Sequence, residues 1–150
     1  MDFLRSGLAL TVLLTIAFSA HVDDARAEQP QGRQHAVLME KKLTSAQEAL
    51  AGLARRNFPE IEKQAQMLNL LSHEAAWNVI QTEEYLRLSD SFRSTTKQLE
   101  RAARDQEADA VGLAYIKLTI SCMDCHRYAD EQQAARTAAE EPDSSAKATQ

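Results

Sequence analysis

The stretch VGLAYIKLTISCMDCH, residues 111–126, combines a helical pattern with both cysteines of the chain. Five of its residues recur at spacings of three and four: Val111, Ala114, Leu118, Cys122 and Cys125. Residues at these spacings lie on one face of an α-helix, and an apolar face is normally turned toward a core. The stretch therefore predicts an amphipathic helix whose buried face ends in two thiols.

The same stretch ends in Cys-Met-Asp-Cys-His, residues 122–126, a pattern typical of covalent attachment of a c-type haem. Two thiols of this pattern bond to the porphyrin, and the histidine binds the iron. Because Cys122, Cys125 and His126 are three or four residues apart, they project from one side of a helix. The prediction is one covalently bound haem c, attached through Cys122 and Cys125, with His126 as the proximal iron ligand.

Three other interpretations of the two cysteines are weaker. A structural zinc site needs four ligands and usually a second pair of cysteines, which this chain does not have. A thioredoxin-like redox pair belongs beside alternating strands and helices, and no stretch alternates apolar and polar residues as a strand does. A disulfide inside one helical turn would be strained and would close almost no loop.

Three further stretches have helical periodicity. Their apolar residues are Met39, Leu43, Ala46, Leu50 and Leu53 in the first, Ile61, Ala65, Leu68, Ala75 and Val79 in the second, and Tyr85, Leu88, Phe92, Thr95, Leu99 and Ala102 in the third. Asn57 and Pro59 separate the first stretch from the second, and Thr82 is suited to cap the helix of the third. The fourth helix should begin near residues 105–107. Short connections make successive helices antiparallel, so we expect an all-α, up-down-up-down four-helix bundle with the haem at one end.

This topology places the start of the first helix beside the end of the fourth. Met39 begins the first apolar stripe at about the depth of His126, and a thioether opposite a histidine is a known pair of axial haem ligands. We therefore expect Met39 to be the distal iron ligand, with a core packing role as the alternative. His35, one turn earlier on the same side, is the competing ligand.

The N-terminal segment predicts export. Arg5 precedes an apolar run over residues 8–20, and Ala25-Arg26-Ala27 provides the small residues that a signal peptidase requires. The run is shorter than the roughly 20 residues of a membrane-spanning helix, so no stable membrane insertion is expected. We assign residues 1–27 to a cleaved secretory signal, 28–137 to the haem domain and 138–150 to a disordered tail.

Composition limits the partners. The chain has 17 Lys and Arg against 22 Asp and Glu, a net charge of −5, which argues against binding to nucleic acid. His73 falls outside the second apolar stripe and is expected at the surface. Leu70 and Trp77 also fall outside that stripe. Two large apolar groups there are expected either to form a homodimer contact or to cover the edge of the haem.

The features together resemble the class II c-type cytochromes, the cytochrome c′ family and its low-spin relatives. The resemblance covers about residues 36–132, and Cys122, Cys125 and His126 carry its specific part. Low-spin members use a methionine near the start of the first helix, a position that Met39 matches. Many members have an aromatic residue three positions and a basic residue four positions after the haem histidine, whereas this chain has Ala129 and Asp130 there.

The resemblance implies a periplasmic or otherwise exported electron carrier with one haem c, and not an enzyme. Redox partner proteins are expected, although residue types do not identify them. The alternative function is a high-spin protein that binds nitric oxide or carbon monoxide at an open distal site. The two functions differ in whether Met39 reaches the iron.

Overall fold

The computed structural model describes residues 30–140. The chain divides into two units, Met1–Arg33 and Gln34–Gln150. Of the first unit, the described part is residues 30–33. The predicted signal of residues 1–27, with its cleavage site, and residues 141–150 of the predicted tail lie outside the described residues.

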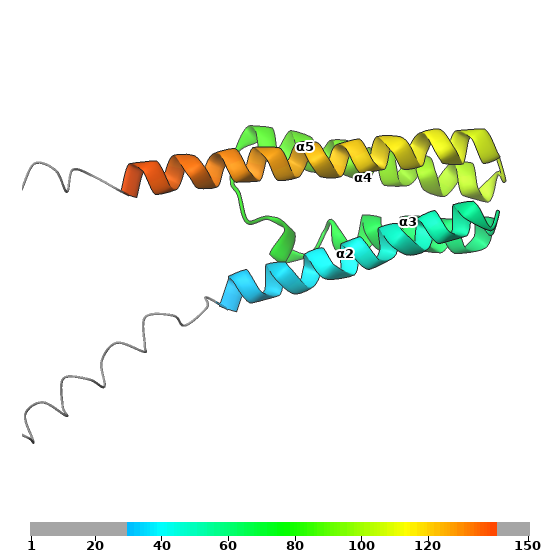
Figure 1. Ribbon diagram of the computed structural model, residues 1–150, viewed down its shortest axis with the longest axis horizontal. Helices are drawn as coiled ribbons and strands as arrows, with labels where there is room; N and C mark the ends of the chain where they lie inside the picture. Colours follow the sequence, from blue (N-terminus) through cyan, green and yellow to red (C-terminus); the bar gives the residue numbers. More distant parts are fainter. Residues whose placement is uncertain (1–29, 141–150) are drawn as a thin grey trace, which may run out of the picture. The chain divides into compact units, whose positions relative to one another are not determined.

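Four long helices follow one another in the described part of the chain (Figure 1). They are α2 (Pro30–Ala54), α3 (Phe58–Leu71), α4 (Glu83–Arg104) and α5 (Ala108–Glu140), with a short 3₁₀ helix, η3 (Ala75–Trp77), between α3 and α4. Residues 30–140 contain no strand. This confirms the predicted all-α four-helix bundle. Residues 138–140, assigned above to the tail, are the last residues of α5.

Two tight turns join α2 to α3 and α4 to α5. Arg56 in the first turn and Gln106 in the second have positive φ angles of 55° and 58°. The amide of Asn57 donates to the carbonyl of Gly52 at 2.8 Å, and an equivalent bond closes the second turn. Such bonds satisfy carbonyls left open at a helix end. Because the helices are antiparallel, both turns lie at one end of the second unit, while the part of α2 that begins at Gln34, the end of α5 and the α3–α4 connection lie at the other.

The predicted inner faces of α4 and α5 are confirmed. All six residues of the α4 stripe are buried, as are Val111, Ala114, Leu118 and Cys125 of α5. The predicted cap at Thr82 is present, and Asn57 caps α3 as well. The Thr82 hydroxyl accepts from the amide of Tyr85 at 3.2 Å, and the Asn57 side chain accepts from Glu60 at the start of α3. His73 is exposed, as expected.

The buried face of α2 differs from the predicted one by a single residue position. Instead of the stripe headed by Met39, the helix buries Leu38, Lys42, Ser45, Ala49 and Gly52, and it leaves Leu43 and Leu50 exposed. Close packing gives one physical reason. A Cβ atom on Gly52 would lie 2.9 Å from Cγ1 of Ile61, so α3 can approach here only because this position has no side chain.

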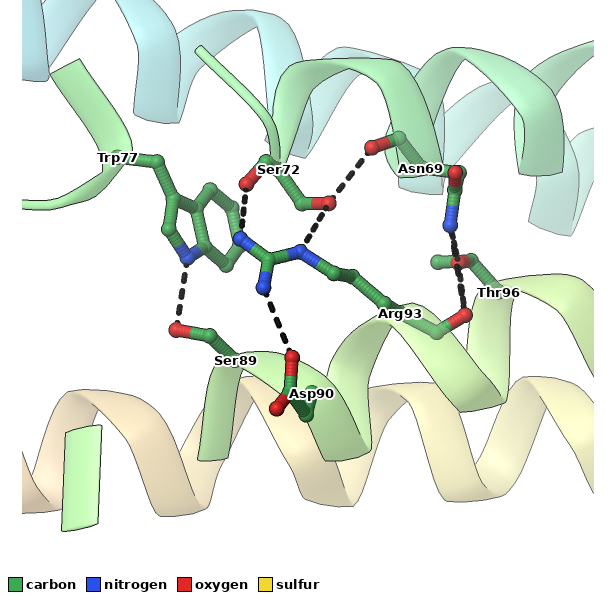
Figure 2. Close-up of polar contacts among 7 residues, drawn as sticks. All are labelled: Asn69, Ser72, Trp77, Ser89, Asp90, Arg93 and Thr96. Carbon is green, nitrogen blue, oxygen red and sulfur yellow. Dashed lines mark hydrogen bonds and ion pairs between the residues drawn. The ribbon is translucent and has the colours of Figure 1, made fainter. Parts of the chain in front are cut away.

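The second predicted helix is shorter than expected. It ends at Leu71 and not at Val79, which is exposed. Figure 2 shows the contacts that hold the chain at this point. The Arg93 guanidinium donates to the carbonyl of Ser72 at 2.7 Å and also reaches its hydroxyl, while Asn69 donates to Thr96 at 2.9 Å. These bonds attach the end of α3 to α4 and turn the chain into η3.

Trp77 lies in the core, contrary to the predicted surface patch. Its side chain is 1% exposed, its ring packs 5.0 Å from that of Phe92, and its indole nitrogen donates to Ser89 at 2.9 Å. Leu70, the other member of the predicted patch, is 60% exposed. The helical spacing used for the prediction does not apply beyond Leu71, because α3 ends there. The two side chains therefore do not form a common surface.

Candidate functional site

A cavity lies at the end of the bundle away from the two tight turns. His35, Met39 and Lys42 line it from α2, Trp77 and Val79 from the α3–α4 connection, Tyr85 from α4, and Cys125, His126 and Ala129 from α5. A neighbouring groove of about 390 Å³ between α2 and α5 is lined by Met39, Glu40, Lys42, Leu43, Ala46, Cys122 and His126. Met39, Lys42 and His126 line both spaces, which together we call the pocket.

Cys122, Cys125 and His126 of α5 all line this pocket, because their spacing of three and four residues places them on one side of the helix. Cys122 is half-buried and Cys125 is buried, and both thiols are free. Burial raises the pKa of both thiols, while the positive charge of Lys42 acts in the opposite direction. The raised pKa favours the protonated form of both thiols at neutral pH.

His126 reaches the mouth of the pocket and is exposed on its outer side. Shielding of its inner side from water lowers the pKa of the imidazole, and the positive charge of Lys42 lowers it further, while Asp130 opposes the shift. The neutral form that results has a free nitrogen lone pair, which is the form of histidine that binds metal ions.

Met39 is partly buried and packs against the core. His35 is one turn earlier, is half-buried, and lies 2.8 Å through Nδ1 from the carbonyl oxygen of Ala76. A carbonyl oxygen only accepts, so Nδ1 must hold the proton, and in the neutral ring Nε2 has the lone pair. Both candidate ligands on α2 thus line the pocket that His126 lines.

Lys42 is the member of the pocket that sequence reasoning missed. The residue is only 5% exposed, and its ammonium lies 4.6 Å from the ring centroids of both Trp77 and Phe92. Within residues 30–140 it has no carboxylate partner. Contacts with two rings offset part of the free energy needed to remove the charge from water. A signal was available, because Leu38, Lys42, Ser45 and Ala49 also recur at helical spacing.

Two tyrosines hold α5 at the pocket. The hydroxyl of Tyr115 donates to the carbonyl of Ala46 on α2 at 3.0 Å, and the hydroxyls of Tyr128 and Thr82 are 2.7 Å apart. Tyr85, on the pocket wall, donates to the carbonyl of Trp77, and burial raises its pKa to about 12. These bonds fix the walls without using the thiols or His126.

Among residues 30–140, no group of three or more His, Cys, Asp or Glu side chains is arranged to hold a metal ion. Within the same range, no helix has the length and apolar character needed to cross a membrane.

Comparison with known proteins adds little. No protein-family model matches the chain, and no curated protein matches it. Among solved structures, the chain is similar to the nitric oxide complex of a mutant cytochrome c prime from Alcaligenes xylosoxidans. The two are 14% identical, the match covers 62% of this chain and 92% of the other, and the TM-score is 0.42. A likeness this weak decides neither the fold nor the function.

Proposed function

We propose that the protein is an exported mono-haem c-type cytochrome that carries electrons and is not an enzyme. One observation carries the proposal: the two free thiols and His126 of the Cys-x-x-Cys-His pattern reach the same pocket as Met39 of α2. The pattern and the pocket are independent, since one comes from five consecutive residues and the other from the packing of distant helices.

Three features of the side chains in the pocket suit a haem: its thiols, its imidazole and its ammonium. Covalent attachment needs two unbridged thiols on one side of a helix, and Cys122 and Cys125 are such a pair. Iron ligation needs a neutral imidazole, which the lowered pKa of His126 favours. A haem also has two carboxylates, and the ammonium of Lys42 is a cation without a carboxylate partner in the described part of the chain.

When bound, the haem would supply an iron that accepts and releases one electron. The chain's own residues would then adjust how readily it does so. His126 would bind the iron on one side, and the soft thioether of Met39 on the other, which favours the reduced state. The positive charge of Lys42 would act in the same direction, because the reduced site has one positive charge fewer.

His35 is the second candidate for the distal ligand, on a specific observation. Its bond to Ala76 leaves Nε2 with the lone pair, as in metal-binding histidines whose other nitrogen is bound to a carbonyl. Met39 remains the proposed ligand because it lines both parts of the pocket, whereas His35 lines only the cavity. If neither reaches the iron, the distal site is open and binding of nitric oxide or carbon monoxide becomes the leading function.

The proposal is tested by the absorption spectrum of the purified protein, oxidised and reduced, with and without carbon monoxide. We expect a low-spin spectrum with the weak near-infrared band of methionine ligation and no response to the gas. A high-spin spectrum that shifts with carbon monoxide would favour gas binding. Absence of haem from the protein made with a working haem-attachment system would refute the proposal.

Three variants sharpen this test. Replacing both Cys122 and Cys125 with Ala should abolish haem that survives denaturation, because no thiol remains to hold it. Met39→Ala should convert the spectrum to high-spin and admit carbon monoxide. The matched control is His35→Ala, which should leave the spectrum unchanged; the opposite result for the two variants would assign the ligand role to His35.

A further inference from the structure

The middle of α5 is apolar on two faces, although packing in the bundle buries only one. Val111, Ala114 and Leu118 are buried, whereas Leu113, Ile116, Ile120 and Met123 are between 51% and 65% exposed. We call the latter four residues the outer α5 stripe. Single exposed apolar residues are normal, but four in a row at helical spacing form a continuous apolar surface. A helix that is apolar on two faces normally has both faces covered.

Charged residues of opposite sign end the outer α5 stripe. Asp109 precedes it and Arg127 follows it, and both are exposed. At 100° per residue, these two residues and the four of the stripe fall within about 80° of arc and span roughly 27 Å. Asp109 has no ion-pair partner within residues 30–140, whereas Arg127 donates through one nitrogen to Asp124 at 2.8 Å and is 69% exposed.

The order of these residues is self-complementary. Position 118 lies midway between Ile116 and Ile120, between Leu113 and Met123, and between Asp109 and Arg127. In an antiparallel pair of α5 helices related by a two-fold axis at this position, each isoleucine faces the other isoleucine of the second copy. The stripe thus has the residue pattern that an isologous contact requires.

Charge selects this arrangement over the parallel one. Antiparallel pairing brings Asp109 of each copy to Arg127 of the other, which gives two ion pairs at the ends of the contact. Parallel pairing would place like charges together at both ends. A partner of unrelated sequence would have to reproduce the same spacing and the opposite charge order, whereas a second copy already has both.

We infer that two copies of this chain associate through the outer α5 stripe, in antiparallel orientation about position 118. The contact uses a surface different from the Leu70 and Trp77 patch expected from the sequence, and it does not depend on bound haem. A standard interface buries about 800 Å² per partner, more than four side chains provide, so the dimer should dissociate on dilution.

The test is the sedimentation of the full chain over a wide range of concentrations. We expect the wild-type protein to change from monomer to dimer as its concentration rises. Replacing both Ile116 and Ile120 with Glu should raise the dissociation constant by about a hundredfold, because two apolar contacts per copy are lost and like charges meet at the centre. Helicity measured by circular dichroism should be unchanged, since both positions are exposed.

A charge exchange tests the orientation. Asp109→Arg should weaken association by about fivefold, because an ion pair at each end becomes a repulsion. Combining it with Arg127→Asp should restore association, a rescue expected only if the two residues meet across the interface. The matched control is Leu70→Glu, which should leave the dissociation constant unchanged. A monomer at every concentration, or a dimer sensitive to the Leu70 variant and not to the isoleucine variant, would overturn the inference.

Discussion

The contact between α3 and α4 and the space between α2 and α5 differ in how fully the chain satisfies its own polar groups. Between α3 and α4, the amide of Asn69 bonds to Thr96 and the guanidinium of Arg93 bonds to Ser72 (Figure 2). Between α2 and α5, the ammonium of Lys42 lies over two aromatic rings beside the pocket, and two thiols are free. Polar groups are paired in both regions, as Tyr115 and Ala46 are between α2 and α5, but the second region also has an ammonium with no carboxylate beside it in residues 30–140.

This difference separates two roles of buried polar residues. A buried group with its partners in place fixes the backbone, as Arg93 does at the end of α3. Lys42 lines the pocket with its ammonium over two rings and with no carboxylate beside it in residues 30–140, so it can receive an anionic group of a ligand. In the search for functional sites, the unpaired groups of a bundle are therefore more informative than its best-formed networks.

The largest expected effect on stability concerns Trp77, which packs against Phe92 of α4. Trp77→Ala should lower the free energy of unfolding by about 3–5 kcal/mol, because it leaves a cavity beside Phe92 and removes one ring from Lys42. Urea unfolding followed by circular dichroism measures this loss. Leu70→Ala, the control, should change the value by no more than about 0.5 kcal/mol. Equal effects of the two variants would contradict the separation of these side chains.

Alkaline pH should lower the free energy of unfolding through Tyr85, which lines the pocket from α4. Burial raises the pKa of Tyr85 from 10.0 to about 12, so the folded state holds this proton more tightly than the unfolded state does. The stabilisation is complete below pH 10 and is lost as the pH rises through 12. It amounts to about 2–3 kcal/mol.

Tyr85→Phe provides the control for this pH effect, since phenylalanine has no proton to lose. Denaturant unfolding at several pH values between 9 and 12 should show a steep fall for the wild-type protein and a flatter curve for the variant. Parallel curves would mean that another group causes the alkaline loss.

Lys42→Met should affect both the stability of the chain and, with haem attached, its reduction potential. Without haem, removal of the unpaired cation should leave the free energy of unfolding unchanged or raise it by about 1 kcal/mol. With haem attached, the loss of a nearby positive charge should lower the equilibrium constant for reduction about tenfold, or about 59 mV. Redox titration measures the second effect. Lys41→Met is the control because Lys41 is exposed on the same helix, and equal shifts from both variants would remove any specific role of Lys42.

The smallest effect is expected at the start of α4. Thr82→Ala removes the cap of this helix and the contact with the hydroxyl of Tyr128, which should lower the free energy of unfolding by about 1 kcal/mol. Thr119→Ala is a suitable control, since this exposed hydroxyl bonds only to a carbonyl of its own helix. A thermal melt that shows no difference between the two variants would place the start of α4 outside the cooperative unit.

Much of the bundle could be predicted from the sequence because its helices have strong local signals. The stripes of α4 and α5, the cap at Thr82 and the helix count all follow from spacing and residue type. The end of α3 could not be predicted, because Arg93, distant in sequence, holds Ser72. The predicted face of α2 was also wrong by one position, because two sets of residues recur there at helical spacing. The contacts that select the buried set, at Gly52 and Lys42, involve residues distant in sequence.

Some residues of the candidate site could be predicted from the sequence and others could not. Cys122, Cys125 and His126 are recognisable because their chemistry depends on adjacent positions, and Met39 follows from topology. Lys42 and Tyr85 belong to the pocket only through packing between helices, so no short motif identifies them.

The close contact at Gly52 has a consequence for the evolution of this chain. Because a Cβ atom at position 52 would lie 2.9 Å from the Ile61 side chain, the two positions share a fixed volume. A relative with Ala or Ser at position 52 should have a smaller residue than Ile at position 61, such as Val or Ala. Paired substitutions at these two positions would therefore distinguish distant relatives that keep this helix spacing from proteins that share only the Cys-x-x-Cys-His pattern.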